Sequence, residues 1–156
     1  MNKKLKDIYI FALMFFFVDQ LIKFYLSTKM IENQSIMLIR KFLNITYVHN
    51  TGAAFSLLEG NTWLLILIGI IAVICFSYYI WKLEYISDFD IFNYSLLLGG
   101  VFGNLIDRIV RGYVIDYISL NIFGYHFPIF NFADMCIVIS VLLIFCSTVK
   151  GDLWKE

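Results

Sequence analysis

The chain alternates between long apolar stretches and shorter polar connectors. Four stretches are apolar enough to be membrane spans, and they cover about residues 8–26, 60–81, 91–107 and 131–149. The second stretch carries no charged residue, and at 1.5 Å per residue it is about 33 Å long, enough to cross the hydrocarbon core of a bilayer. The pattern therefore predicts an all-α membrane protein with four transmembrane helices.

The third stretch has a charged residue at each limit. The segment between Asp90 and Asp107 is short for a bilayer. We therefore expect its helix to extend past one of these two residues.

Two long connectors, residues 27–59 and 108–130, join the first span to the second and the third to the fourth. Because the number of spans is even, both connectors lie on the side of the membrane opposite the termini. Lys3, Lys4 and Lys6 precede the first span and favour cytoplasmic termini, although the 12 basic residues divide evenly between the two sides. We therefore expect extracytoplasmic connectors.

The first connector contains an alternating segment, Ile45-Thr46-Tyr47-Val48, which favours a strand over a helix. We therefore expect a small extracytoplasmic β-rich subdomain between residues 30 and 58. The whole chain, residues 1–156, is expected to form a single integral membrane domain.

The composition excludes several classes of protein. Hydrophobic residues make up 61% of the chain and charged residues only 15%, whereas a soluble domain carries roughly a quarter charged residues. The 12 basic residues are balanced by 12 acidic ones and form no basic block, which argues against a nucleic-acid binder. The three cysteines lie in apolar runs, where a disulfide framework is not expected.

Four acidic residues lie within or next to the spans. Asp19, Asp107, Asp116 and Asp134 all fall near the same membrane face if the spans alternate in direction. Because a charge in the bilayer is costly, such residues point to function. The alternative is that they are interfacial carboxylates that reach water and cap helices.

Asparagine precedes two of these aspartates at the same spacing. Asn104 and Asp107, like Asn131 and Asp134, are three positions apart and would share a helix face. Each asparagine could therefore orient its aspartate or a substrate carbonyl, or it could cap a helix end. Arg108 directly follows Asp107, and its guanidinium can bind a carboxylate in a fork.

Most other catalytic arrangements are excluded. His49 and His126 are the only histidines, no H-E-x-x-H motif exists, and a metal site is not expected. A pair of Ser56 and His49 would have to come from one loop, and the chain has no G-x-S-x-G motif, P-loop or dinucleotide fingerprint. No cofactor is therefore expected.

Among the catalytic arrangements considered, acid–base catalysis by two aspartates is the one that remains. Two carboxyl groups close together share a proton, so that one can activate water while the other protonates a carbonyl oxygen. From the pattern alone, either Asp107 or Asp116 could be one of the pair. Gly52, within a segment of small residues, would let the backbone come close to a bound chain.

Five motifs in this order resemble those of the lipoprotein signal peptidase family, also called signal peptidase II. They are VDQLIK (18–23), NTGAAFS (50–56), GGVFGNLIDR (99–108), GYVIDYI (112–118) and FNFAD (130–134). Two departures from the family pattern are Ile22 in the first motif, where the family usually has Ser or Thr, and Tyr117 in the fourth, where Phe is common.

The resemblance implies an aspartyl endopeptidase of the bacterial inner membrane. Its members remove the signal peptide from prolipoproteins just before a diacylglyceryl-modified cysteine, and they are inhibited by globomycin. The resemblance assigns the catalytic pair to Asp116 and Asp134 and makes Asp107 a structural or orienting carboxylate. The polar residues that it places around the site are Asp19, Asn50, Asn104, Arg108 and Asn131.

Two other classes stay open on the residues alone. Carboxylates, arginine and asparagine in a helical bundle are also typical of a small transporter or a proton-relay subunit. The clustering of these residues at one face and the lack of an obvious inverted repeat argue against that class. A membrane assembly factor is the third possibility, and it would not need either Asp116 or Asp134.

Overall fold

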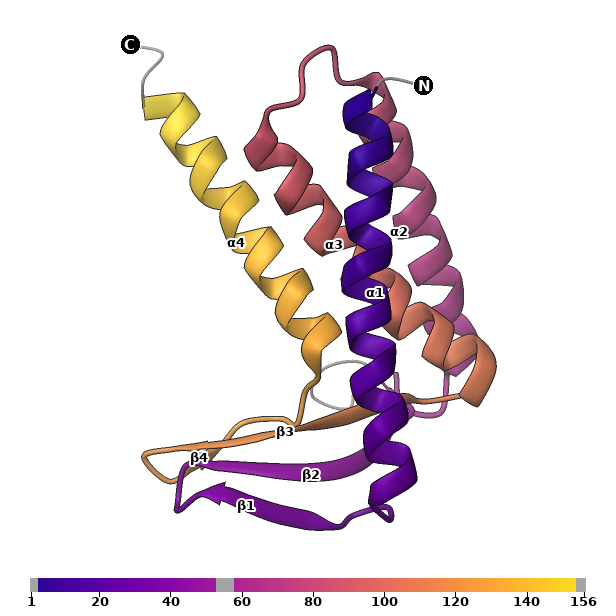
Figure 1. The fold of residues 1–156 in the computed structure, drawn as a ribbon, viewed down its shortest axis with the longest axis vertical. Helices are drawn as coiled ribbons and strands as arrows, with labels where there is room; N and C mark the ends of the chain where they lie inside the picture. The colour runs from indigo at the N-terminus through magenta and orange to yellow at the C-terminus, as the bar shows by residue number, and fades with distance from the viewer. Residues whose placement is uncertain (1–2, 53–57, 154–156) are drawn as a thin grey trace.

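The computed structural model describes residues 3–52 and 58–153. Four helices, each long and apolar enough to cross a membrane, run roughly side by side, and a small sheet lies at the end of the bundle opposite the two termini (Figure 1). They are α1 (Lys3–Lys29), α2 (Thr62–Lys82), α3 (Asp88–Arg111) and α4 (Phe132–Leu153). The predicted fold class, four transmembrane helices with a small β-rich part, is confirmed.

Helix α3 is longer than its apolar stretch and passes both of the charges that bound it. Its N-terminus is fixed by a capping box, in which Ser87 and Asp90 each accept from the other's backbone N–H. It ends at Gly112, which adopts the left-handed conformation (φ 82°) that glycine takes without strain. Asp107 stays inside the helix because Lys23 and Arg111 neutralise it. We expected α3 to extend past one charge, and it extends past both.

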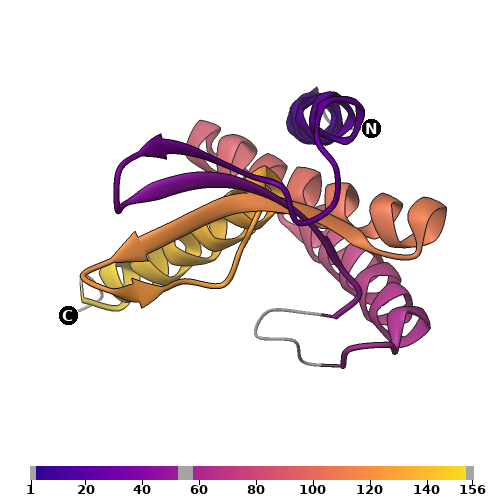
Figure 2. The same cartoon turned by 90° about the horizontal axis from the view of Figure 1, so that it is seen from below.

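The sheet is antiparallel, with the strand order β1-β2-β3-β4. Its strands are β1 (Ser35–Ile39), β2 (Leu43–Asn50), β3 (Val114–Ile122) and β4 (Tyr125–His126). Figure 2, seen from below, shows the strands passing in front of α3 and α4. The predicted β-rich part between residues 30 and 58 supplies β1 and β2, while β3 and β4 come from the second connector, where no strand was predicted.

Only the first half of β3 lacks an alternation of apolar and polar positions, because Val114, Ile115, Asp116 and Tyr117 are all buried. The second half, ISLNI (118–122), does alternate, and this signal could have predicted the strand. Pairing of β2 with β3 sets Asn50 opposite Val114. The sheet therefore brings residues from the two connectors together at one place.

Small residues let α1 and α4 approach α3 closely. A Cβ atom added at Gly99 would lie 2.7 Å from the backbone oxygen of Ala12 in α1. One at Gly100 would lie 2.5 Å from the backbone oxygen of Ala133 in α4. Since no side chain fits at either position, the three helices pack backbone to backbone.

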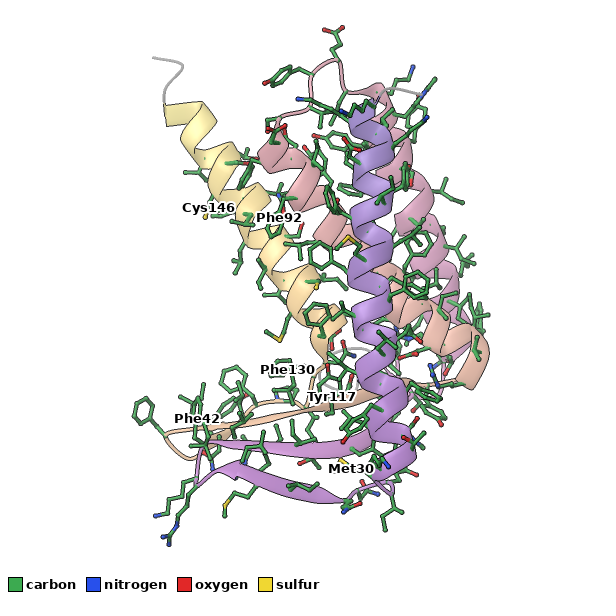
Figure 3. All side chains as sticks on the ribbon, viewed as in Figure 1. Met30, Phe42, Phe92, Tyr117, Phe130 and Cys146 are labelled. Carbon is green, nitrogen blue, oxygen red and sulfur yellow. The ribbon has the colours of Figure 1, made fainter. Side chains whose placement is uncertain are left out.

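An apolar cluster joins the sheet to the end of α1. Met30, Tyr47, Ile115 and Tyr117 are buried together, and Figure 3 shows Met30 and Tyr117 at this junction. The cluster fixes β2 and β3 relative to α1, and thereby positions the polar residues that these elements carry.

Candidate active site

Asp116 and Asp134 come from different elements and are bound by the same asparagine. Asp116 lies on β3, and Asp134 lies in the first turn of α4. The side-chain Nδ2 of Asn131 donates to Asp116 Oδ1 at 2.7 Å, while the backbone N–H of Asn131 donates to Asp134 Oδ2 at 3.1 Å. One buried residue therefore connects the two carboxyl groups.

The N-terminus of α4 explains how Asp134 is held. Asn131 Oδ1 accepts from the backbone N–H of Asp134 at 2.9 Å and caps the helix. The hydroxyl oxygen of Tyr117 accepts from the N–H of Phe132 at 3.1 Å, and Asp19 Oδ1 accepts from the N–H of Ala133 at 3.0 Å. Three amide donors that the helix cannot pair internally are thus satisfied by α4's own cap, by β3 and by α1.

Of the two interpretations of the Asn-x-x-Asp spacing, the cap applies to residues 131–134, whereas the aspartate that the Asn131 side chain orients is Asp116. Asn131 caps α4 through its oxygen and donates to Asp116 through its nitrogen. In the other pair, Asn104 donates to Asp134 rather than to Asp107. The asparagine of that pair thus faces a carboxylate on another helix.

Two further asparagines complete the set of donors to the carboxylates. Asn50 Nδ2 donates to Asp116 Oδ2 at 2.7 Å. Asn104 Nδ2 donates to Asp134 Oδ1 at 2.6 Å, and Asn104 Oδ1 accepts from Asn131 Nδ2 at 3.1 Å. Each of the four carboxylate oxygens therefore accepts one amide N–H, and these donors fix the direction in which each carboxyl group points.

The environment of Asp116 favours a proton on this carboxyl group. Its side chain is almost fully buried. Burial, followed by the neighbouring charge of Asp134, raises the pKa of Asp116 to about 7, and the bonds from Asn50 and Asn131 oppose this shift only in part. A carboxyl group with this pKa can both give and take a proton near neutral pH.

Arg108 and Gly52 lie beside the dyad, but Arg108 does not form the expected fork with a carboxylate. Its Nη2 donates to the backbone oxygen of Gly52 at 2.8 Å, and its Nη1 donates to the backbone oxygen of Asn104 at 3.3 Å. The N–H of Gly52 in turn donates to Asn50 Oδ1 at 2.9 Å. Arg108 thus holds the segment that carries Asn50. The rest of the NTGAAFS motif, with Ser56, lies outside the described residues.

A buried ion cluster lies behind the dyad, and sequence reasoning missed most of it. Lys23 Nζ lies 2.7 Å from Asp19 Oδ2 and 2.8 Å from Asp107 Oδ2, and Arg111 also pairs with Asp107. Gln20 Nε2 donates to both aspartates at 3.2 Å. Each aspartate is four positions before its cation, Asp19 before Lys23 and Asp107 before Arg111, and this spacing was the signal in the sequence.

The site is built from oxygen and amide groups. Among residues 3–52 and 58–149, no three His, Cys, Asp or Glu side chains gather in a way that could hold a metal ion. The chemistry that the residues offer is proton transfer by two carboxyl groups with amide donors around them.

Comparison with known proteins places this geometry in a family. The family described as signal peptidase (SPase) II matches residues 11–150. The chain is 41% identical to the lipoprotein signal peptidase of Staphylococcus aureus, over 88% of this chain and 85% of that protein. It is 36% identical to the lipoprotein signal peptidase of Lactiplantibacillus plantarum, over 89% of this chain and 91% of that protein.

Solved structures agree with the sequence comparison. A bacterial membrane enzyme determined at 2.3 Å resolution aligns with a TM-score of 0.88 and 39% identity, covering 94% of this chain and 90% of that one. A second, determined at 1.9 Å, aligns with a TM-score of 0.80, also at 39% identity, covering 94% of this chain and 92% of that one. The chain belongs to the signal peptidase II family of membrane proteases.

Proposed function

We propose that the protein is an aspartyl endopeptidase that removes the signal peptide from diacylglyceryl-modified prolipoproteins, cutting just before the lipidated cysteine. Its relatives are named lipoprotein signal peptidases. The observation that carries the proposed chemistry is the connection of Asp116 and Asp134 through Asn131. The proposed catalytic groups are Asp116 and Asp134.

The mechanism uses one proton shared by the two carboxyl groups. The ionised aspartate takes a proton from a water molecule, whose oxygen attacks the scissile carbonyl carbon. The protonated aspartate donates to the carbonyl oxygen as the tetrahedral intermediate forms. Collapse of the intermediate breaks the C–N bond, and a proton passes to the leaving amine. Since the two groups titrate as a pair, neither role is assigned to a particular residue.

The substrate is expected to reach the dyad from the bilayer. The dyad lies on β3 and in the first turn of α4, and Figure 1 shows these two parts at the end of the bundle opposite the termini. With cytoplasmic termini, this end is the extracytoplasmic face of a bacterial cytoplasmic membrane, where a precursor exposes its cleavage site. The acyl chains would stay among membrane lipids. Asn50, Gly52 and Arg108 lie where they could hold the precursor's backbone.

A globomycin-like peptide is expected to compete with the precursor, and no metal, cofactor or nucleic acid is expected to take part. A transporter or proton relay is less well supported, because the buried polar residues of this site gather at one end of the bundle. The middle of α2, by contrast, is apolar. A path across the membrane would need polar groups along its length.

The test is cleavage of a purified lipidated precursor by the reconstituted protein. We expect Asp116→Asn and Asp134→Asn each to lower kcat by at least about a thousandfold, because each removes a proton-transfer group. Asp88→Asn is the matched control, since Asp88 is exposed at the opposite end of the bundle. A chelator should leave turnover unchanged.

Release of free signal peptide separates the classes, because neither a transporter nor an assembly factor produces it. Substantial turnover by Asp116→Asn or Asp134→Asn at normal protein level would overturn the dyad. Failure of the unaltered protein to release any signal peptide would overturn the whole proposal.

A further inference from the structure

The mechanism above leaves Lys23 unused, although its environment is unusual. Its side chain is completely buried in a bundle that crosses the membrane. A buried ammonium is costly unless all of its donors are paired. Lys23 uses all three, toward Asp19 and Asp107 as ion pairs and toward Asn104 Oδ1 at 3.0 Å.

The contact with Lys23 also determines which end of the Asn104 amide faces Lys23, because an ammonium group has donors and no acceptor. Only the oxygen of the Asn104 amide can therefore face Lys23. The nitrogen of the amide must then face the other way, where it donates to Asp134 Oδ1 at 2.6 Å. In the reversed orientation, the amide nitrogen would face Lys23 and the amide oxygen would face a carboxylate.

We propose that Lys23 is a positioning residue that sets the orientation of the Asn104 amide, so that its N–H bonds the Asp134 carboxyl group. The inference rests on the proposed function, since it assigns a role within the same dyad. Lys23 acts through Asn104 and does not touch the substrate.

The cluster around Lys23 provides a second effect. Asp19 and Asp107 are its acidic members, Lys23 and Arg111 its basic ones, so the cluster is neutral as a whole. Loss of Lys23 would leave an excess negative charge behind the dyad. The charge of Lys23 also contributes to lowering the pKa of Asp116. Without it, the dyad should keep its shared proton to higher pH.

Arg111 offers a matched control within the same cluster. Like Lys23, it pairs with Asp107, but its described contacts are with Asp107 and Gln20 and not with Asn104. Lys23→Met and Arg111→Met therefore remove the same charge from the same cluster, and only the first frees the Asn104 amide.

The experiment measures kcat, KM and the pH profile for the full-length protein in lipid, with a purified lipidated precursor. We expect Lys23→Met to lower kcat roughly 10- to 100-fold, as for the loss of one hydrogen bond to a charged group, with KM changed by less than about threefold. Its alkaline limb should move to higher pH. Arg111→Met should keep kcat within about threefold.

Should Lys23→Met fail to fold, the double variant Asp19→Asn/Lys23→Met keeps the cluster neutral and is judged by its kcat and KM alone. The proposal is overturned if the variant tested keeps its kcat, or if Arg111→Met loses as much kcat as Lys23→Met. Asp116→Asn, measured in parallel, separates this outcome from failure of the proposed function. An active Asp116→Asn refutes the dyad, whereas an inactive one with an unaffected Lys23 variant refutes only the role of Lys23.

Discussion

Asn131 performs two tasks with its two side-chain atoms, and substitutions can separate them. Its oxygen caps α4 by accepting from the N–H of Asp134, and its nitrogen donates to Asp116 and to Asn104. Serine at position 131 can still cap the helix, because its hydroxyl accepts the same N–H. It cannot replace an amide donor placed one bond farther from the backbone. Alanine can do neither.

The size of each effect follows from the interactions that each variant loses. A lost cap costs about 1 kcal/mol, so Asn131→Ala should unfold roughly 2–4 °C below Asn131→Ser. Both variants lose the hydrogen bond to Asp116, which is worth about 1.5–3 kcal/mol when the carboxylate is ionised. Their kcat should therefore fall by about 10- to 100-fold, by nearly the same factor in each.

The pH profile gives a further test of the same substitution. The bond from Asn131 stabilises the ionised form of Asp116, so its loss should raise the pKa of that group above the value of about 7. The alkaline limb of activity should then move to higher pH. The assays are release of signal peptide from a lipidated precursor and thermal unfolding in detergent. An Asn131→Ser variant with full kcat and an unmoved limb would refute the orienting role. Equal unfolding temperatures for the two variants would refute the cap.

Three other expectations follow from the same contacts. Activity of the unaltered protein should decline as pH rises through about 7, because the pair then loses its shared proton; a flat profile from pH 5 to 9 would contradict a dyad with this pKa. The raised pKa of Asp116 implies that the folded state loses stability as pH rises from about 4 to 7. Asp116→Asn lacks this loss, so its free energy of unfolding should increase relative to that of the unaltered protein by about 2–3 kcal/mol between pH 5 and 8. Denaturation at the two pH values would measure this difference. A Cβ at Gly103 would lie 2.6 Å from Asp19 Oδ2, so Gly103→Ala should destabilise the protein by about 1–3 kcal/mol and lower kcat. At Gly69 the closest contact of an added Cβ is the flexible end of Leu105 at 3.1 Å, so Gly69→Ala should be nearly neutral in both assays.

Hydrophobic pattern alone was enough for the four-helix plan, because lipid requires long uncharged segments whatever their partners. The ends of the helices were harder to predict from the sequence. We took Asp107 as the end of a span, since a charge is costly at membrane depth. In the structure, α3 continues to Arg111 because Lys23 on α1 and Arg111 one turn later neutralise that charge. A partner on another helix leaves no trace in the pattern of one helix.

The active site was hard to predict for the same reason, because its contacts join residues far apart in the sequence. The four aspartates near one face could be found by counting charges, but the choice between Asp107 and Asp116 came from the family resemblance. The half of strand β3 that carries Asp116 is continuously buried and lacks the alternation that residues 118–122 show. Its position opposite β2 depends on pairing between residues far apart in the sequence. The asparagines were visible as residues, but their partners depend on that pairing.

The structure offers a physical basis for the choice that the residues left open. Asp19 and Asp107 each form an ion pair with a buried or partly buried cation, so each carboxylate has a partner of opposite charge. In the described part of the chain, no lysine or arginine forms an ion pair with Asp116 or Asp134, and the hydrogen bonds to their side chains all come from amide groups.

Amide donors orient a carboxyl group without neutralising its charge. Two such groups close together favour a shared proton, which is the property that acid–base catalysis requires. The bundle thus holds two kinds of carboxylate at one end. Those neutralised by cations join the helices α1 and α3, and those that accept only from amides are the pair that we propose for proton transfer. Asp107 belongs to the first kind and Asp116 to the second. This difference in partners, more than depth in the membrane, supports the proposal that Asp116 and Asp134 carry out the reaction.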